Sequence, residues 1–149
     1  MNSPVTYVSF LASLILLVAT WSHADVAQPI PNPNIYLTHT EYVVVGGKEF
    51  KRYHFDVFNK DAFPAALFES APSLAPCGTN TNASRTWIDL YAQSGKRLNG
   101  FCAIRSSNDL NDLWFALESD VLPPSWIYIE FTDRQTNRKY KSNLADTVQ

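Results

Sequence analysis

The amino-acid sequence predicts an all-β domain, a two-layer antiparallel β-sandwich of about seven strands. Short runs of β-branched and aromatic residues recur after residue 34, and glycine turns or proline corners separate them. No segment shows the apolar period of a long amphipathic helix. Because alternating side chains of such runs fill the space between two sheets, we expect one sandwich domain over 35–149.

The first two runs predict a β-hairpin. Residues 35–45 and 50–58 flank Gly46-Gly47, and both glycines can take the positive φ that a tight hairpin turn needs. The second run alternates between an apolar face with Tyr53, Phe55 and Val57 and a polar face with Arg52, His54 and Asp56.

Residues 59–84 interrupt the strand pattern and predict one long loop. Pro64 suits the first position of a short helical turn over 63–68. A loop of this length inside a compact domain is usually functional, held in place, or both.

Five further strands are expected between this loop and the end of the chain. In the first of them, Ile88 and Leu90 face away from Trp87, Asp89 and Tyr91. Turn-forming residues separate the strands. The strands are expected over 85–91, 97–104, 113–117, 126–131 and 139–142.

Residues 1–24 predict a secretory signal peptide. The apolar run from Phe10 to Trp21 is shorter than the roughly 20 residues that span a bilayer, and it ends in a small-x-small pattern. A proline-rich extended leader, 25–34, follows. We therefore expect a secreted or periplasmic protein with no membrane segment after cleavage. Because residues 1–7 carry no Lys or Arg, an uncleaved anchor is the alternative.

Cys77 and Cys102 are the only cysteines, and they predict a disulfide bond. Two cysteines in an exported domain more often pair than remain free. The bond would hold the long loop in place and, by closing about 25 residues, would stabilise the fold by about 3–4 kcal/mol. Two buried thiols are the alternative.

The charge balance and the motifs exclude several function classes. A net charge of −2 without a polybasic stretch does not suit a nucleic-acid partner. Ser84 lacks the glycines of a nucleophile elbow, and no histidine follows it in the sequence to act as its base. We therefore assign no catalytic residue and no cofactor.

His39, His54 and Asp56 are the residues that come closest to a metal site. The two histidines lie on the two arms of the hairpin, where the register can pair them. A strand histidine is usually a surface residue, however, so no metal is predicted. Residues 108–112 carry oxygen ligands suited to calcium, but Asn and Asp in turns usually bond to nearby backbone.

Aromatic side chains supply the candidate binding surface. The candidate ligand-binding residues are Arg85, Trp87, Tyr91 and Trp126. Exposed aromatic side chains on strands can bind a sugar or a protein partner. The alternative places two of Trp87, Trp114 and Trp126 in an ordinary sandwich core. Arg85 is also expected to pair with Asp89 on the same face.

Two features of the sequence resemble those of known proteins. The strand order from Tyr53 onward is similar to that of an immunoglobulin or fibronectin type III sandwich, with Leu122 as the apolar partner of a tyrosine corner at Tyr128. Residues 76–91, 100–102, 113–116 and 140–143 resemble small secreted bacterial proteins of unassigned function. The resemblance implies a β-rich exported domain and brings no activity or site residue.

We therefore expect an exported, non-enzymatic β-sandwich that binds a protein or carbohydrate partner. The alternative is a small secreted enzyme or enzyme inhibitor whose site is built by the 59–84 loop. Exposed aromatic candidates beside that loop would favour binding. A closed polar pocket joining His54, Asp56 and Arg85 would favour chemistry.

Overall fold

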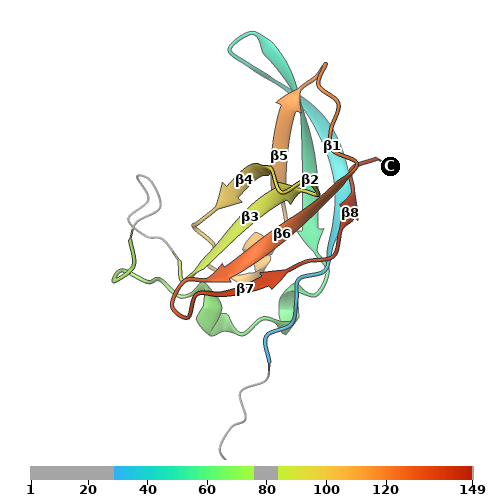
Figure 1. Cartoon of the computed structure of the whole chain (residues 1–149). Helices are drawn as coiled ribbons and strands as arrows, with labels where there is room; N and C mark the ends of the chain where they lie inside the picture. The colour runs from blue at the N-terminus through green and yellow to red at the C-terminus, as the bar shows by residue number, and fades with distance from the viewer. Residues whose placement is uncertain (1–28, 76–83, 149) are drawn as a thin grey trace, which may run out of the picture.

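The computed structural model describes residues 29–75 and 84–148. The expected signal peptide (1–24), the first part of the leader and Cys77 lie outside these ranges, so the predictions that concern them stay predictions. Within the described ranges the protein is all-β, as the sequence predicts (Figure 1).

Two antiparallel sheets make up the fold. One sheet has the order β1-β2-β5, and the other has the order β4-β3-β6-β7 with β8 pairing to β6. The strands of the first sheet are β1 (Ile35–Val45), β2 (Lys48–Val57) and β5 (Leu113–Glu118). Those of the second are β3 (Thr86–Ala92), β4 (Arg97–Phe101), β6 (Trp126–Asp133), β7 (Arg138–Lys141) and β8 (Ala145–Asp146).

The strand order departs at one strand from a constant-type immunoglobulin sandwich. In an immunoglobulin sandwich of this type, the fourth strand belongs to the same sheet as the first, second and fifth strands. In this protein, β4 instead pairs with β3 in the other sheet. The expected tyrosine corner is wrong, because Leu122 is 90% exposed and the ring of Tyr128 stacks on Tyr91. Ile127 and Ile129 occupy the inward positions of β6, so Tyr128 between them points outward.

The β1–β2 hairpin forms as predicted. Gly46 and Gly47 have φ values of 59° and 81°, so both residues of the turn lie in the left-handed region. Val45 pairs with Lys48 next to the turn, and a bulge between Leu37 and His39 shifts the register further along the strand. The two-glycine turn therefore sets which residues of β1 and β2 face each other.

Alternating side chains of both sheets fill the core. Phe55, Ile88 and Leu90 have no exposed surface, in agreement with the predicted inward faces of their strands. Phe115 of β5 stacks on Phe55 and Tyr53, with ring centroids 6.0 and 4.8 Å apart. Each such side chain contributes about 1.5–3 kcal/mol when it leaves water, so the core supplies the main stabilisation.

The described first part of the 59–84 loop closes one end of the core. It contains two 3-10 helices, η1 (Lys60–Ala62) and η2 (Ala65–Phe68), and Pro64 is the N-cap of η2. Phe63 is buried and stacks on Phe131 with ring centroids 5.0 Å apart. In the ranges that the structure describes, no helix is long and apolar enough to cross a membrane.

The edges of the two sheets are joined on both sides of the sandwich. On one side, Asn99 Nδ2 of β4 donates to the carbonyl oxygen of Trp114 in β5 at 2.6 Å. On the other, the side chain of Asn143 accepts from the N–H of Ile35 at 2.8 Å and donates to its carbonyl oxygen at 3.0 Å. These bonds hold β1 and β5, the outer strands of the first sheet, against the second sheet.

Candidate functional site

The outer face of the second sheet carries most of the predicted binding residues. Because Ile88 and Leu90 point inward, Trp87, Asp89 and Tyr91 of β3 all point outward. The registers then place the neighbours of β3 beside them. Tyr128 and Glu130 of β6 lie opposite Tyr91 and Asp89, and Gly100 of β4 lies on the other side of Asp89.

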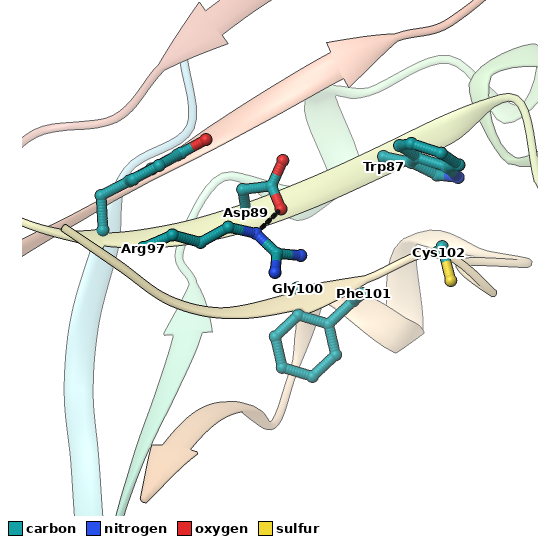
Figure 2. Close-up of a pocket in the computed structure, with 7 residues that line it drawn as sticks. Trp87, Asp89, Arg97, Gly100, Phe101 and Cys102 are labelled. Carbon is teal, nitrogen blue, oxygen red and sulfur yellow. Dashed lines mark hydrogen bonds and ion pairs between the residues drawn. The ribbon is translucent and has the colours of Figure 1, made fainter. Parts of the chain in front are cut away.

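A groove of about 320 Å³ runs over β3 and β4 (Figure 2). We call it the β3–β4 groove. Its lining residues are Trp87, Asp89, Tyr91, Arg97, Gly100, Phe101 and Cys102.

An ion pair crosses the middle of the β3–β4 groove. Arg97 Nε donates to Asp89 Oδ1 at 2.6 Å, and Figure 2 shows this pair lying over β4 beside Gly100. A Cβ atom on Gly100 would lie 1.8 Å from Arg97 Nη2 and 2.8 Å from Asp89 Oδ1. The absence of a side chain at Gly100 therefore makes the space in which the pair lies.

The aromatic rings on this face are packed against one another and against cations. Tyr91 and Tyr128 stack with ring centroids 5.3 Å apart, and burial, assisted by the charges of Asp89 and Glu130, raises the pKa of Tyr91. Lys141 Nζ lies 3.8 Å from the ring centroid of Tyr128. Such contacts hold the rings in fixed orientations on the sheet surface.

Neither Trp87 nor Trp114 belongs to the core, so the core interpretation of the tryptophans is wrong. Both are half-buried on outer faces, because the inward positions beside them are taken by Ile88 and by Leu113 and Phe115. Arg134 Cζ covers one face of Trp87 at 3.9 Å from the ring centroid, and Arg52 Cζ lies 4.6 Å from Trp114. Trp126 is 41% exposed but does not line the groove.

The Nε1–H group of Trp87 is buried and has no hydrogen-bond acceptor among the described residues. A buried donor without an acceptor costs about 1–3 kcal/mol. Among the described residues, contact with Arg134 rather than a hydrogen bond holds this ring.

Arg85 does not take part in the β3–β4 groove. Its guanidinium binds Asp133 through two hydrogen bonds, Nε to Oδ1 at 2.7 Å and Nη2 to Oδ2 at 2.6 Å. The expected ion pair between Arg85 and Asp89 is wrong, because the β3–β4 register brings Arg97 to Asp89 instead. Arg85 thus connects the start of β3 to the end of β6 through Asp133.

The two strand histidines meet on the outer face of the first sheet. His39 and His54 are register partners, and their rings stack with centroids 4.2 Å apart. His54 is 5% exposed, and its two ring nitrogens contact the carboxylates of Glu41, at 3.1 Å, and Asp112.

Asp56 joins this network without contacting a histidine. Its Oδ1 accepts from the backbone N–H of Asp112 at 2.8 Å, which supports the positive φ of 69° at Asp112. In the part of the chain that the structure describes, no group of three or more His, Cys, Asp or Glu side chains is placed to hold a metal ion.

His54, Asp56 and Arg85 would favour an enzyme if they lined one pocket, but they lie on different sheets. His54 and Asp56 share the network around Asp112 on the first sheet. Arg85 is bound to Asp133 at the second sheet. The structure therefore does not bring the three side chains into one polar pocket.

The Asn- and Asp-rich run 108–112 bonds to nearby backbone through Asp109 and to a distant side chain through Asn108. The side chains of Ser106 and Asp109 form a capping box around η3 (Ser107–Leu110), and Asn108 Oδ1 accepts from Lys60 Nζ at 3.2 Å. The capping box agrees with the turn interpretation of the run.

Cys102 lines the β3–β4 groove at the end of β4. Its expected disulfide partner, Cys77, lies outside the described residues, as does the 76–83 part of the loop. The disulfide therefore stays a prediction.

Sequence reasoning found Trp87 and Tyr91 but missed Arg97, Gly100 and Phe101. A glycine in the middle of the expected strand 97–104 was the one available signal, since such a glycine often marks a close approach. Comparison with known proteins adds nothing to this site: no family model, no curated protein and no solved structure matches the chain.

Proposed function

We propose that this domain is a non-enzymatic recognition module that binds a short carbohydrate chain in the β3–β4 groove. The observation that carries the proposal is the row of outward side chains along β3. Two aromatic rings, Trp87 and Tyr91, flank an Asp89–Arg97 pair that lies beside Gly100.

The two rings suit the apolar faces of sugars. The C–H groups of a sugar ring pack against the electron-rich face of an aromatic side chain. Trp87 and Tyr91 are four residues apart on one strand, a separation of about 13 Å. This spacing favours an elongated ligand that contacts both rings over a single small molecule that contacts one.

The polar pair between the rings suits neighbouring hydroxyl groups. A carboxylate accepts hydrogen bonds and a guanidinium donates them, so Asp89 and Arg97 together can bind hydroxyls of either orientation. The Arg97 side chain is 59% exposed, and a surface pair of this kind contributes only about 0–1 kcal/mol to stability. A ligand can therefore rearrange the pair at little cost.

The dimensions and lining of the groove favour binding over chemistry. Its volume of about 320 Å³ lies at the small end of the range for ligand sites, roughly 300–1,000 Å³. Its described lining includes no histidine and one carboxylate, which is already paired with Arg97. The ordered side chains offer contacts and hydrogen bonds, as a recognition site needs.

The predicted export of the protein supports the same function. The predicted signal peptide, 1–24, would place the domain outside the cytosol, where glycans of cell surfaces and extracellular matrices are available. A disulfide from Cys77 to Cys102 would anchor one end of the groove, because Cys102 lines it.

Binding to an array of neutral and acidic oligosaccharides tests the proposal. We expect binding to at least one oligosaccharide, followed by titration calorimetry with that compound. Trp87→Ala and Tyr91→Ala should each weaken binding at least about tenfold, since truncating a central aromatic contact removes more than about 1.4 kcal/mol.

Trp126→Ala is the matched control, because Trp126 is an exposed tryptophan of the same sheet that does not line the groove. It should bind as the unchanged protein does, and circular dichroism should show that all variants are folded. Equal loss of affinity in the Trp126 variant, or no binding to any oligosaccharide of the array, would contradict the proposal.

A further inference from the structure

The tip of the β1–β2 hairpin extends past the end of the sandwich (Figure 1). Several of its apolar side chains are exposed. Tyr42, Val44 and Val45 are 63%, 70% and 61% exposed, although they belong to a regular strand. Isolated exposed apolar residues are common on protein surfaces, but a group of them on one strand end marks an interaction surface.

The same segment has an open backbone edge. In the described part of the chain, strand β1 pairs only with β2, and its beginning at Ile35 is bonded to Asn143. The backbone of 41–45 makes no hydrogen bond on the side away from β2 within those described residues. The opposite edge of the sheet differs, because β4 lies against β5 and Asn99 bonds to it.

The open edge lacks the features that usually prevent edge pairing. Natural edge strands are protected by lysine, proline or a bulge. The bulge of β1 precedes His39, and 40–45 contains neither lysine nor proline. Its one charged side chain, Glu41, is already bound to Arg52 at 2.9 Å and to His54 at 3.1 Å.

We propose that a second copy of this chain pairs with this edge, β1 against β1 in antiparallel orientation, to form a continuous six-stranded sheet across a two-fold axis. The hydrogen-bonding edge of a strand is complementary to itself in this orientation, as a two-fold interface requires. The net charge of −2 gives only slight repulsion between copies.

The exposed side chains indicate a two-fold axis at Val43. In that register Val43 faces its own copy, and Tyr42 faces Val44 of the second copy on both sides of the axis. Aromatic and β-branched side chains directly opposite each other stabilise antiparallel pairs. Glu41 faces Val45 of the second copy, so no like charges meet.

Charge substitution at Val43 tests both the interface and its register. Sedimentation velocity over about 1–100 µM should show the unchanged protein at twice the mass of one copy. Val43→Lys and Val43→Glu each place two like charges directly opposite each other. Each should therefore raise the dissociation constant at least about tenfold. An equal mixture of the two variants should recover the dimer, because Lys then faces Glu.

Phe58→Lys is the matched control, since Phe58 is 76% exposed and follows the other end of β2. It should remain a dimer. The proposal is overturned if the unchanged protein is monomeric at the highest concentration. It is also overturned if the Val43 variants dimerise with the same dissociation constant as the unchanged protein, or if their mixture, shown to be folded by circular dichroism, fails to pair.

Discussion

Asp133 shows at the scale of one residue how this chain stabilises a buried charge. Its side chain is 2% exposed and accepts two hydrogen bonds from Arg85, one from Thr136 Oγ1 at 2.7 Å and one from the N–H of Gln135 at 3.1 Å. The hydrogen bonds from Arg85, opposed by burial, lower the pKa of Asp133 from 3.8 to about 2. The carboxylate therefore stays charged inside the fold.

This lowered pKa predicts a loss of stability in acid. An unfolded chain protonates Asp133 near pH 3.8, whereas the folded protein does so only near pH 2. Stability from this group is therefore complete above about pH 4 and is lost as the pH falls toward 2, by about 2 kcal/mol. Urea unfolding of the unchanged protein and of Asp133→Asn, compared from pH 5 to pH 2, measures the difference.

Asp133→Asn should be less stable at pH 5 and should approach the unchanged protein as the pH falls. Asp89→Asn serves as its control, because Asp89 belongs to a surface pair whose contribution is about 0–1 kcal/mol. Parallel pH curves for the unchanged protein and Asp133→Asn would show that Asp133 does not carry the acid sensitivity.

At the scale of the element, β5 separates a structural face from an exposed one. Phe115 points inward, is 1% exposed and stacks on both Tyr53 and Phe55 of β2. Trp114, one position earlier, points outward under Arg52. Of these two adjacent aromatic residues, Phe115 packs in the core and Trp114 lies on the outer face, because successive side chains of a strand point to opposite faces.

Truncation of these two side chains should separate their contributions. Phe115→Ala leaves a cavity in the core and should lower the free energy of unfolding by about 3–5 kcal/mol. Trp114→Ala removes a partly exposed ring and its contact with a cation, and should cost about 1 kcal/mol. Denaturant unfolding of both variants checks this, and similar losses would show that the assigned faces of β5 are wrong.

The faces of single strands were predictable, but the neighbours of strands were not. The alternation of Ile88 and Leu90 with Trp87 and Tyr91 correctly placed the binding candidates on an outer face. Which strand lies beside β3 depends on the packing of the whole chain, so sequence reasoning paired Asp89 with Arg85. The structure pairs it with Arg97 of β4. The β3–β4 groove was missed for the same reason.

Two further differences have local causes. β8 was not expected, because Ala145 and Asp146 carry no strand signal and pair with β6 only through the position of the last segment. His54 was expected at the surface, but it lies buried between Glu41 and Asp112. The charged partners come from β1 and from the turn before β5, which no local pattern could bring together.

At the scale of the whole molecule, the expected disulfide would connect the end of β4 to the 59–84 loop. Titration of the denatured, exported protein with a thiol reagent should find no free thiol before reduction and two after it. Reduction should lower the free energy of unfolding by about 3–4 kcal/mol, the value for a closed loop of about 25 residues. Two reactive thiols before reduction would rule the bond out.

The bonds between Asn143 and Ile35 connect positions 108 residues apart. A ribosome adds about 5–20 residues per second, so β1 is synthesised several seconds before the side chain that completes it. Until then β1 has neither its bonds to Asn143 nor a complete second sheet to pack against. The open edge of β1 is thus present through most of the synthesis of the chain, and the hairpin with β2, the next strand along the sequence, is the first pairing available to it.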